Sequence, residues 1–248
     1  MRVRLLGPVC LQSRNSTVRP ASGRARSLLA VLAWEPNGFV ADEVLIQRIW
    51  GPSVPSDPRD ALYTSAKRLR GSIREISATD CLVRRRGGYL LRTEPDRIDL
   101  HRFRRLTAAA RAAERDDRRS GLYKQAIRLW SGTPLADVDC AWSRGARESM
   151  TVEWLTARIA AIEVDLRLGR HAEVAPALIS LMHEYPRDER IAAMLMLALY
   201  LNGQRAEALT WYTRIRTGLV ESLGNEPGAA LRRLHLRILH DDHTLREL

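Results

Sequence analysis

The chain has 248 residues, of which 45% are hydrophobic, and its formal net charge is +11. This length allows one large domain or two domains of ordinary size. The charge favours a polyanionic partner, nucleic acid first and an anionic membrane second. The longest apolar-rich stretch, residues 191–201, is shorter than the roughly 20 residues that a membrane-spanning helix needs.

The positive charge is concentrated in the N-terminal part of the chain. Residues 1–97 contain 17 lysines and arginines against 9 aspartates and glutamates, a net charge of +8. Residues 98–248 contain 23 against 20, a net charge of +3. We therefore expect the N-terminal part to meet the polyanion and the remainder to form a soluble scaffold.

The cysteines and the N-terminus indicate a reducing compartment. Cys10, Cys81 and Cys140 lie far apart, and no Cys/His pattern has the spacing of a metal site. An odd number of cysteines also argues against a disulfide framework. The apolar part of the N-terminus is too short for a signal peptide. We expect a cytoplasmic, nucleoid-associated protein with no cofactor, no metal and no membrane partner.

The first forty residues predict a small β element and then a helix. Residues 2–11 alternate between apolar and polar side chains, which predicts a short hairpin or meander. Residues 13–23 are rich in turn formers. Helical periodicity follows over residues 23–34, with Ser22 as the predicted N-cap. Residues 35–38 contain proline and glycine and end this helix.

Two further helices are predicted before residue 77. A short extended link at residues 39–40 leads to a helix that ends near Trp50, and Asp42 is its predicted N-cap. Three prolines mark residues 51–58 as a loop. The third helix is expected over about residues 57–76.

The third helix combines an apolar stripe with a cationic face. The stripe has the spacing of one buried helix face and consists of Leu62, Ala66, Leu69 and Ile73. A polar, basic opposite face suits a recognition helix, because arginine binds guanine O6 and N7 and threonine contacts a thymine methyl or a phosphate. The alternative is the solvated face of an ordinary amphipathic helix.

A basic hairpin is expected directly after this helix. Residues 81–84 and 89–92 read as strands, and Gly87 and Gly88 between them form a turn signal. Three consecutive arginines, residues 84–86, would face phosphates or a minor groove at the hairpin tip. The alternative is a charged edge strand that discourages aggregation. A β segment, three helices and a hairpin form the plan of a winged helix-turn-helix.

The predicted DNA contacts all lie on the third helix and the hairpin. They are Arg59, Tyr63, Thr64, Lys67, Arg68, Arg70, Arg74, Arg84, Arg85, Arg86 and Tyr89. In this prediction Lys67, Arg68 and the hairpin arginines hold the register through phosphates. The side chains of Tyr63, Thr64 and Arg70 approach the bases.

The second half of the chain is almost entirely helical and contains a repeat. We expect two domains, residues 1–95 and residues 98–248. Gly169 and Gly203 begin similar Gly-x-x-Ala-Glu segments 34 residues apart, which is the tetratricopeptide period, and Pro186 ends the first unit. The expected fold is mainly α with small β elements, a winged helix-turn-helix followed by an all-α tetratricopeptide-like domain.

Nine short motifs, in order along the chain, resemble those of a known family. They are residues 5–8, 23–30, 45–51, 68–70, 88–91, 126–132, 168–173, 197–200 and 223–228. On these motifs the chain resembles the SARP family of bacterial antibiotic regulatory proteins. In that family an OmpR-type winged helix is fused to a bacterial transcriptional activation domain.

The resemblance implies a transcriptional activator and not an enzyme. It implies binding to direct repeats in double-stranded promoter DNA as a dimer, recruitment of RNA polymerase through its sigma or alpha subunit, and activation of a secondary-metabolite gene cluster. It also assigns a polymerase-contact loop, which consists of Gly51, Pro52, Ser53, Val54 and Pro55. The family's wing usually reads Arg-Pro-Pro-Gly-Tyr, whereas residues 85–89 here read Arg-Arg-Gly-Gly-Tyr, so the DNA sequence that is bound is left open. The chain has neither a Walker A loop nor a receiver domain, so we expect no control by ATP or aspartyl phosphorylation within it.

Two other classes of function stay open at this point. The helical repeats could form an adaptor that binds a peptide or senses a ligand without direct DNA reading, with the basic half serving only solubility. An enzyme is disfavoured, because the chain has no HExxH, GxSxG or phosphate-binding glycine loop. His240 and His243 flank two aspartates and could hold a metal in principle, but a solvated tail is the preferred interpretation.

Overall fold

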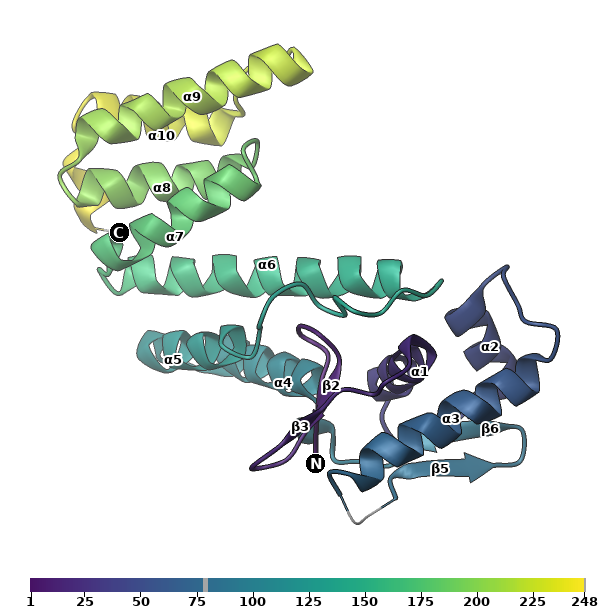
Figure 1. Cartoon of the computed structure of the whole chain (residues 1–248). Coiled ribbons are helices and arrows are strands. Elements are labelled where there is room, and N and C mark those ends of the chain that lie inside the picture. The colour runs from purple at the N-terminus through teal and green to yellow at the C-terminus, as the bar shows by residue number, and fades with distance from the viewer. Residues whose placement is uncertain (78–79, 248) are drawn as a thin grey trace. The chain divides into compact units, whose positions relative to one another are not determined.

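The computed structural model describes residues 1–77 and 80–247, which are mainly helical with small antiparallel sheets (Figure 1). These residues form two compact units. The first consists of residues 1–112 and 122–157, and the second of residues 113–121 together with residue 158 onward. Helices α5 (Asp116–Ile127) and α6 (Ser143–Arg167) contribute to both units. The predicted mainly α fold is confirmed.

The N-terminal meander is present as a three-stranded antiparallel sheet. It consists of β1 (Arg2–Arg4), β2 (Cys10–Gln12) and β3 (Thr17–Val18), in that order. Val3 pairs with Leu11, and both side chains are buried. The third strand lies in the stretch that was expected to contain only turns.

Helix α1 (Gly23–Trp34) is the central helix of the first unit. The side-chain oxygen of Ser22 accepts a hydrogen bond from the Ala25 N–H at 3.2 Å, which confirms the predicted N-cap. Apolar side chains of this helix are fully buried, among them Leu28, Leu29 and Leu32. Both α2 and α3 pack against α1, so α1 supports the buried face of α3.

The predicted N-cap of the second helix is wrong. Helix α2 (Asp42–Trp50) follows β4 (Val40–Ala41) without a break, so Ala41 occupies the cap position and Asp42 is the first helical residue. Its backbone N–H donates to the Gly87 carbonyl at 2.8 Å. The Asp42 side chain is therefore free to bond elsewhere, and it accepts two hydrogen bonds from Arg84.

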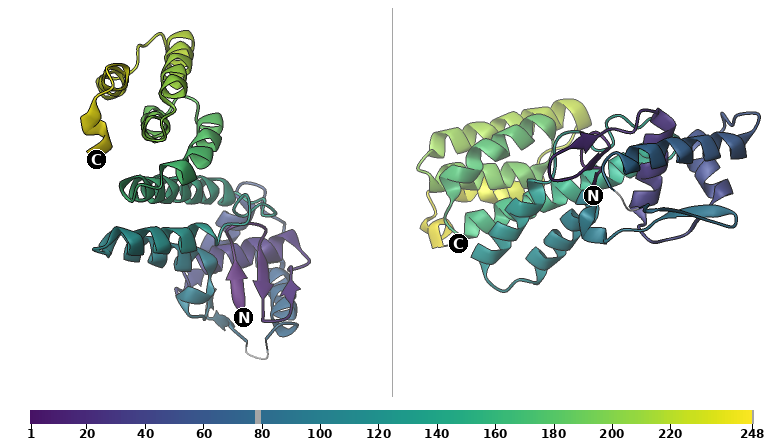
Figure 2. Two further views of the ribbon diagram at one scale, coloured as in Figure 1. Left: turned by 90° about the vertical axis from the view of Figure 1, so that its left-hand side faces the viewer. Right: turned by 60° about the horizontal axis from the view of Figure 1, so that its bottom comes forward.

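A second sheet and α3 complete the winged helix. Helix α3 (Pro58–Arg74) packs against α1 and α2, and the strands β5 (Leu82–Arg85) and β6 (Gly88–Leu91) form the hairpin. The sheet order is β4-β6-β5, all antiparallel. The right-hand view of Figure 2 shows α3 and the β5–β6 hairpin running side by side.

The N-terminal sheet is tied to the helix that follows the hairpin. A 3-10 turn η1 (Pro95–Arg97) leads into α4 (Asp99–Ala112). The Asp99 carboxylate accepts the backbone N–H groups of Leu5 and Leu6 at 2.8 and 3.1 Å. Contacts of this kind explain why the first compact unit extends past the predicted boundary at residue 95.

The second unit is a stack of antiparallel helices. Its helices after α6 are α7 (His171–Glu184), α8 (Glu189–Leu201), α9 (Arg205–Leu223) and α10 (Ala229–Leu239), followed by the 3-10 turn η2 (His243–Glu247). Helix α8 packs against α7, α9 and α10 and is almost completely buried. Across residues 1–77 and 80–247, we find no helix with the length and apolar character needed to span a bilayer.

The 34-residue repeat is visible in the backbone of two turns. Gly169 and Gly203 have φ values of +73° and +77°, a conformation that glycine adopts without steric cost. The N–H groups of residues 169 and 170 bond to the carbonyls of residues 166 and 165, and residues 203 and 204 repeat this pattern with residues 200 and 199. The sequence repeat therefore corresponds to a repeated helix-turn-helix, as predicted.

Candidate nucleic-acid interface

The start of α3 is defined by local sequence chemistry. The Asp57 carboxylate accepts a hydrogen bond from the Asp60 N–H at 2.9 Å, and Pro58 occupies the first helical position. Asp60 lies in the first turn, where a negative charge interacts favourably with the helix dipole. The loop therefore ends abruptly and α3 begins in a defined direction.

One face of α3 is buried as the apolar spacing predicted. The side chains that pack against α1 and α2 are Leu62, Ala66, Leu69 and Ile73. Ser65 and Ser72, on the same side, satisfy their hydroxyls with backbone carbonyls one turn earlier. The rotation of α3 about its axis is therefore determined, and the opposite face points to solvent.

The solvent face of α3 carries cations that no carboxylate neutralises. Lys67, Arg68 and Arg74 are exposed, and within the described residues none of them forms an ion pair. Tyr63 exposes 58% of its surface, and Thr64 is half-buried beside it. This face offers hydrogen-bond donors and positive charge to a polyanion.

Arg59 is held only weakly. Its guanidinium lies 3.1 Å from the Glu43 carboxylate, and the two side chains are 78% and 69% exposed. An ion pair this exposed is worth little and is screened by salt. Arg59 can therefore exchange Glu43 for a phosphate at small cost.

The hairpin tip presents two further cations. Arg85 and Arg86 are exposed, and the turn continues through Gly87, whose φ is +78°. A side chain at Gly88 would place its Cβ 2.3 Å from the Val40 carbonyl oxygen. The two glycines are thus required by the turn and by the close approach of β4.

Arg84 and Tyr89 of the hairpin meet Arg70 of α3 and the buried Asp42 of α2 in a cluster that we call the Tyr89 clamp (Asp42, Arg70, Arg84 and Tyr89). Arg84 donates to both Asp42 carboxylate oxygens at 2.5 and 2.8 Å. Its guanidinium lies 4.4 Å from the centre of the Tyr89 ring, and that of Arg70 lies 5.9 Å from it. Arg70 also donates to the Leu82 carbonyl at 3.2 Å.

The Tyr89 clamp corrects part of the predicted contact set. The exposed fraction of Tyr89 is only 1%, so its ring has no surface for a DNA contact. The Arg70 side chain is 22% exposed and is directed at Asp80 and β5. The hydrogen bonds that Arg84 donates to the Asp42 carboxylate raise the pKa of Arg84 above its ordinary value. These three side chains join α2, α3 and the hairpin, while Arg84 itself stays 45% exposed.

The loop after α2 is exposed at its tip. Gly51 has a φ of +57°, and a Cβ there would lie 2.8 Å from the Cβ of Ala141. Pro52, Ser53 and Val54 are exposed, with Val54 at 47%, and Pro55 is half-buried. The loop therefore presents a small apolar surface at the end of the helix pair.

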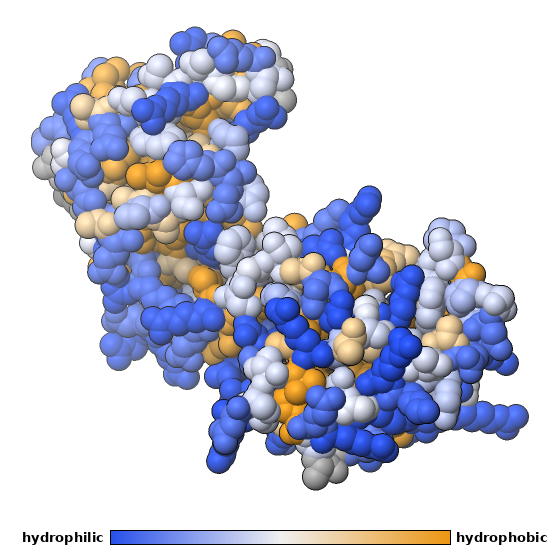
Figure 3. All heavy atoms as spheres, in the orientation of Figure 1, coloured by the Kyte–Doolittle hydropathy of each residue, from blue (hydrophilic) through white to orange (hydrophobic). Residues whose placement is uncertain are grey.

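The cations of α3 and of the hairpin tip are exposed on two neighbouring elements of the first unit (Figure 2). Figure 3 shows hydrophilic side chains over most of the surface above α3 and the hairpin in that view, with small apolar patches between them. Among the described residues, no group of three or more His, Cys, Asp or Glu side chains could hold a metal. The arrangement suits the binding of an extended polyanion.

The sequence comparisons identify relatives over the full length of the chain. Residues 98–239 match the family model described as the bacterial transcriptional activator domain. The chain is 33% identical to the regulatory protein DnrI of Streptomyces peucetius, covering 98% of this chain and 93% of that protein. It is 32% identical to the transcriptional regulator RedD of Streptomyces coelicolor, covering 99% and 72%.

Two further relatives are longer than this chain. The regulatory protein AfsR of Streptomyces griseus is 34% identical, and the chain spans 25% of its length. A solved structure, Mycobacterium tuberculosis EmbR in complex with low affinity phosphopeptide, superposes with a TM-score of 0.88 at 28% identity. The match covers 99% of this chain and 68% of that one.

Sequence reasoning missed the buried partner of the hairpin. Asp42 was interpreted as a cap, whereas its carboxylate anchors Arg84 across 42 residues of sequence. A signal was available, because an acidic residue directly after a short strand can face the neighbouring strand as well as cap a helix. Nothing in the local pattern distinguishes the two roles.

Proposed function

Because the chain belongs to the SARP family of bacterial transcriptional regulators, we propose that it binds direct repeats in promoter DNA and recruits RNA polymerase. The family consists of regulators and not of enzymes. In this proposal residues 1–95 are the DNA-binding domain, and residues 98–248 make protein contacts. The genes that it activates are those of a secondary-metabolite cluster, and it acts at the nucleoid in the cytoplasm.

The observation that carries the proposal is the unpaired cationic face of α3 beside the hairpin tip. A B-form major groove is wide enough for an α-helix. With α3 in the groove, Lys67 and Arg68 reach phosphates or guanine edges, and Tyr63 and Thr64 approach bases. The hairpin tip, residues 85–86, then meets the backbone of the neighbouring strand.

Direct repeats would place two protomers side by side on the duplex. Each protomer would put one α3 into a major groove, with half-sites separated by about one helical turn or a multiple of it. Because direct repeats have no two-fold axis, the two protomers would contact each other head to tail. We therefore propose a dimer that forms on DNA.

The loop of residues 51–55 is the proposed polymerase contact. Its exposed Val54 supplies an apolar side chain, and Val44 on α2 is exposed as well. The partner surface would be a sigma or alpha subunit region of RNA polymerase. Because the loop is not part of α3 or the hairpin, it can stay accessible while DNA is bound.

The test is to sequence the DNA fragments that the purified full chain retains from a fragmented genome. We expect enrichment of sites with two similar half-sites in the same orientation. Gel shifts against a retained and a shuffled duplex, at two salt concentrations, then separate specific from electrostatic binding. No affinity for either duplex at low salt would reject the proposal and favour an adaptor built on the helical repeats.

A further inference from the structure

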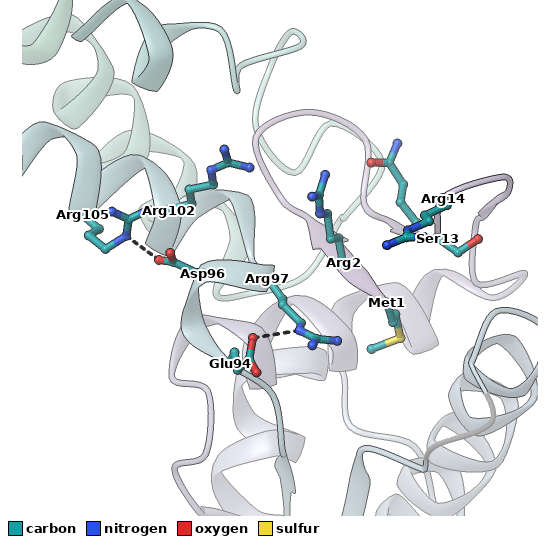
Figure 4. A pocket seen from close by; sticks show the side chains of 10 residues that line it. Met1, Arg2, Ser13, Arg14, Glu94, Asp96, Arg97, Arg102 and Arg105 are labelled. Carbon is teal, nitrogen blue, oxygen red and sulfur yellow. Dashed lines mark hydrogen bonds and ion pairs between the residues drawn. The ribbon is translucent and has the colours of Figure 1, made fainter. Parts of the chain in front are cut away.

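A second basic site lies away from α3 and the hairpin. It is a hollow of about 560 Å³ in the first unit, between the N-terminal sheet, η1 and α4 (Figure 4). Its lining residues are Met1, Arg2, Gln12, Ser13, Arg14, Glu94, Asp96, Arg97, Arg102 and Arg105. We call this hollow the arginine pocket. Its charged residues come from four separate segments of the chain.

The charges of the arginine pocket do not balance. Five arginines face two carboxylates, an excess of three positive charges. Arg97 pairs with Glu94 at 3.0 Å, and Arg105 pairs with Asp96 at 2.6 Å. Both carboxylates are therefore already engaged.

Three arginines remain without a carboxylate in the described part of the chain. They are Arg2 on β1, Arg14 in the turn after β2, and Arg102 on α4. Figure 4 shows them around one opening, with dashed lines only at the Arg97 and Arg105 pairs. Like charges gathered in one hollow repel each other unless an anion lies between them.

The walls of the arginine pocket are held in place by backbone contacts. Val3 on β1 forms a β-bridge with Ile98, the residue between η1 and α4. The Asp99 carboxylate bonds the N–H groups of Leu5 and Leu6. Arg2 and Arg102 are therefore carried by elements whose separation is set before any ligand arrives, which lowers the cost of ordering them.

A smaller hollow of about 180 Å³ continues the arginine pocket along β1. The two share Arg2, Asp96, Arg97 and Arg102, and the smaller one adds Arg4, Arg128 and the carboxyl group of Asp99. A ligand that fills both would meet guanidinium groups in each of them. A single small anion such as monophosphate would occupy only part of this space.

We propose that the arginine pocket binds a small molecule that carries two or more linked phosphates. Two linked phosphates carry about three negative charges at neutral pH, which matches the excess in the pocket. Guanidinium forks bind phosphate oxygens in pairs. The volume lies in the roughly 300–1,000 Å³ range of small-molecule sites. The site goes beyond DNA binding and would give the regulator a chemical input.

The concave shape favours a small ligand over duplex DNA. None of the lining residues belongs to α3, to the hairpin or to the loop of residues 51–55. A bound diphosphate would bridge β1 to α4 and reinforce the contacts that already join them. Binding should therefore raise the melting temperature of the chain.

The test is isothermal titration calorimetry of the full chain with inorganic pyrophosphate, compared with inorganic phosphate and with adenosine diphosphate. We expect saturable pyrophosphate binding, at least about tenfold tighter than phosphate. An Arg2→Ala/Arg102→Ala double variant should lose at least about tenfold in affinity. The matched control is Arg111→Ala, which removes an exposed arginine from α4 outside the pocket. Adenosine diphosphate shows whether a nucleoside adds affinity.

A second variant separates site loss from misfolding. Arg102→Lys keeps the charge and loses the fork, so it should weaken pyrophosphate binding while its melting curve without ligand matches the wild type. No saturable pyrophosphate binding, or an equal loss in Arg111→Ala, would overturn the proposal. A second combined result would also overturn it: duplex DNA displaces pyrophosphate, and the double variant binds DNA more weakly. The pocket would then be part of the DNA contact. Failure of DNA binding alone would leave the pyrophosphate result unaffected.

Discussion

The two compact units differ in how some of their arginines are paired. In the second unit several of them are paired with carboxylates at 2.6–2.8 Å: Arg167 with Asp116, Arg170 with Asp165, Arg190 with Glu163, Arg216 with Glu226, and Arg237 with Asp242. On the outer face of α3 and the hairpin tip of the first unit, the cations have no such partner among the described residues. They are Lys67, Arg68, Arg74, Arg85 and Arg86.

The difference lies in where the carboxylates are. Residues 98–248 contain nearly as many acids as bases, whereas residues 1–97 have a net charge of +8. Arginine abundance alone therefore does not identify a nucleic-acid surface, because several arginines of the second unit form ion pairs within the fold. The more informative feature is that cations without a carboxylate partner are concentrated on one helix and one hairpin tip.

The largest expected effect is loss of DNA affinity on α3. A Lys67→Ala/Arg68→Ala double variant should bind a retained duplex about 10- to 100-fold more weakly, because two cations leave the backbone or the bases. If both contacts are to phosphates, the slope of log affinity against log salt should fall by about 2. Fluorescence anisotropy at several salt concentrations measures both quantities. An unchanged slope and affinity would place the binding surface elsewhere.

The next largest effect is the pH dependence of stability that the buried carboxyl group of Asp99 produces. Burial raises the pKa of Asp99 to about 6, whereas the hydrogen bond from Arg237 lowers the pKa of Asp242 to about 2. The folded state thus binds a proton at Asp99 more tightly than the unfolded state, whose pKa is near 3.8. Asp99 should add about 2 kcal/mol of stability as pH falls from 7 to 4.

The Asp99→Asn variant isolates this contribution, because asparagine does not titrate. Urea unfolding at several pH values should show wild type gaining stability relative to the variant between pH 6 and pH 4. Asp242, Asp116 and Glu226 have the opposite effect on the pH dependence of stability, because arginines lower the pKa values of these three acids. They cancel in the difference between the two proteins. A difference that does not change with pH would contradict the assignment.

The Tyr89 clamp supplies a third test within the first unit. Asp42→Ala should destabilise the fold by about 2 kcal/mol, because Arg84 and the buried Tyr89 ring lose the carboxylate that orders them. Asp60→Ala is the matched control, since that acid is exposed and only supports a helix start. The control should cost less than about 1 kcal/mol. Equal losses in the two variants would show that the clamp does not stabilise the unit.

The smallest effect is expected in the second unit. Arg216→Ala removes an exposed arginine from its pair with Glu226, and it should change neither DNA affinity nor the melting temperature measurably. It is a charge-matched control for a single Arg68→Ala variant, which should lose part of the DNA affinity that the double variant loses, because each substitution removes one arginine. A loss of DNA affinity as large as that of Arg68→Ala would show that net charge, and not position, determines binding.

Local patterns predicted the elements of the interface, and long-range contacts decided the roles of individual side chains. The stripe of Leu62 and Ile73, the Ser22 cap and the glycine turn depend on neighbours a few residues away, so the sequence predicts them. Arg84 is predicted to contact DNA as part of the triple-arginine run, and Tyr89 as part of the hairpin. Their packing in the clamp depends on Asp42, 42 residues before Arg84, which no local period reveals.

The arginine pocket was even less accessible to prediction from local sequence patterns. Its arginines come from β1, from the turn after β2, from η1 and from α4, and each is an ordinary surface residue in its own segment. The pairing of β1 with β2, the Val3–Ile98 bridge and the bonds to Asp99 bring them together. A charge count along the chain detects the excess of positive charge in residues 1–97. It does not show that basic residues gather on two separate surfaces, the face of α3 with the hairpin tip and the arginine pocket.

Photocrosslinking of the full chain to a retained duplex tests the central claim most directly. A photoreactive residue is placed at position 63, on the solvent face of α3, or at position 152, which is exposed on α6. Position 63 should crosslink to bases within each half-site, and position 152 should yield no specific product. Crosslinks from position 152 with none from position 63 would show that α3 does not enter the groove.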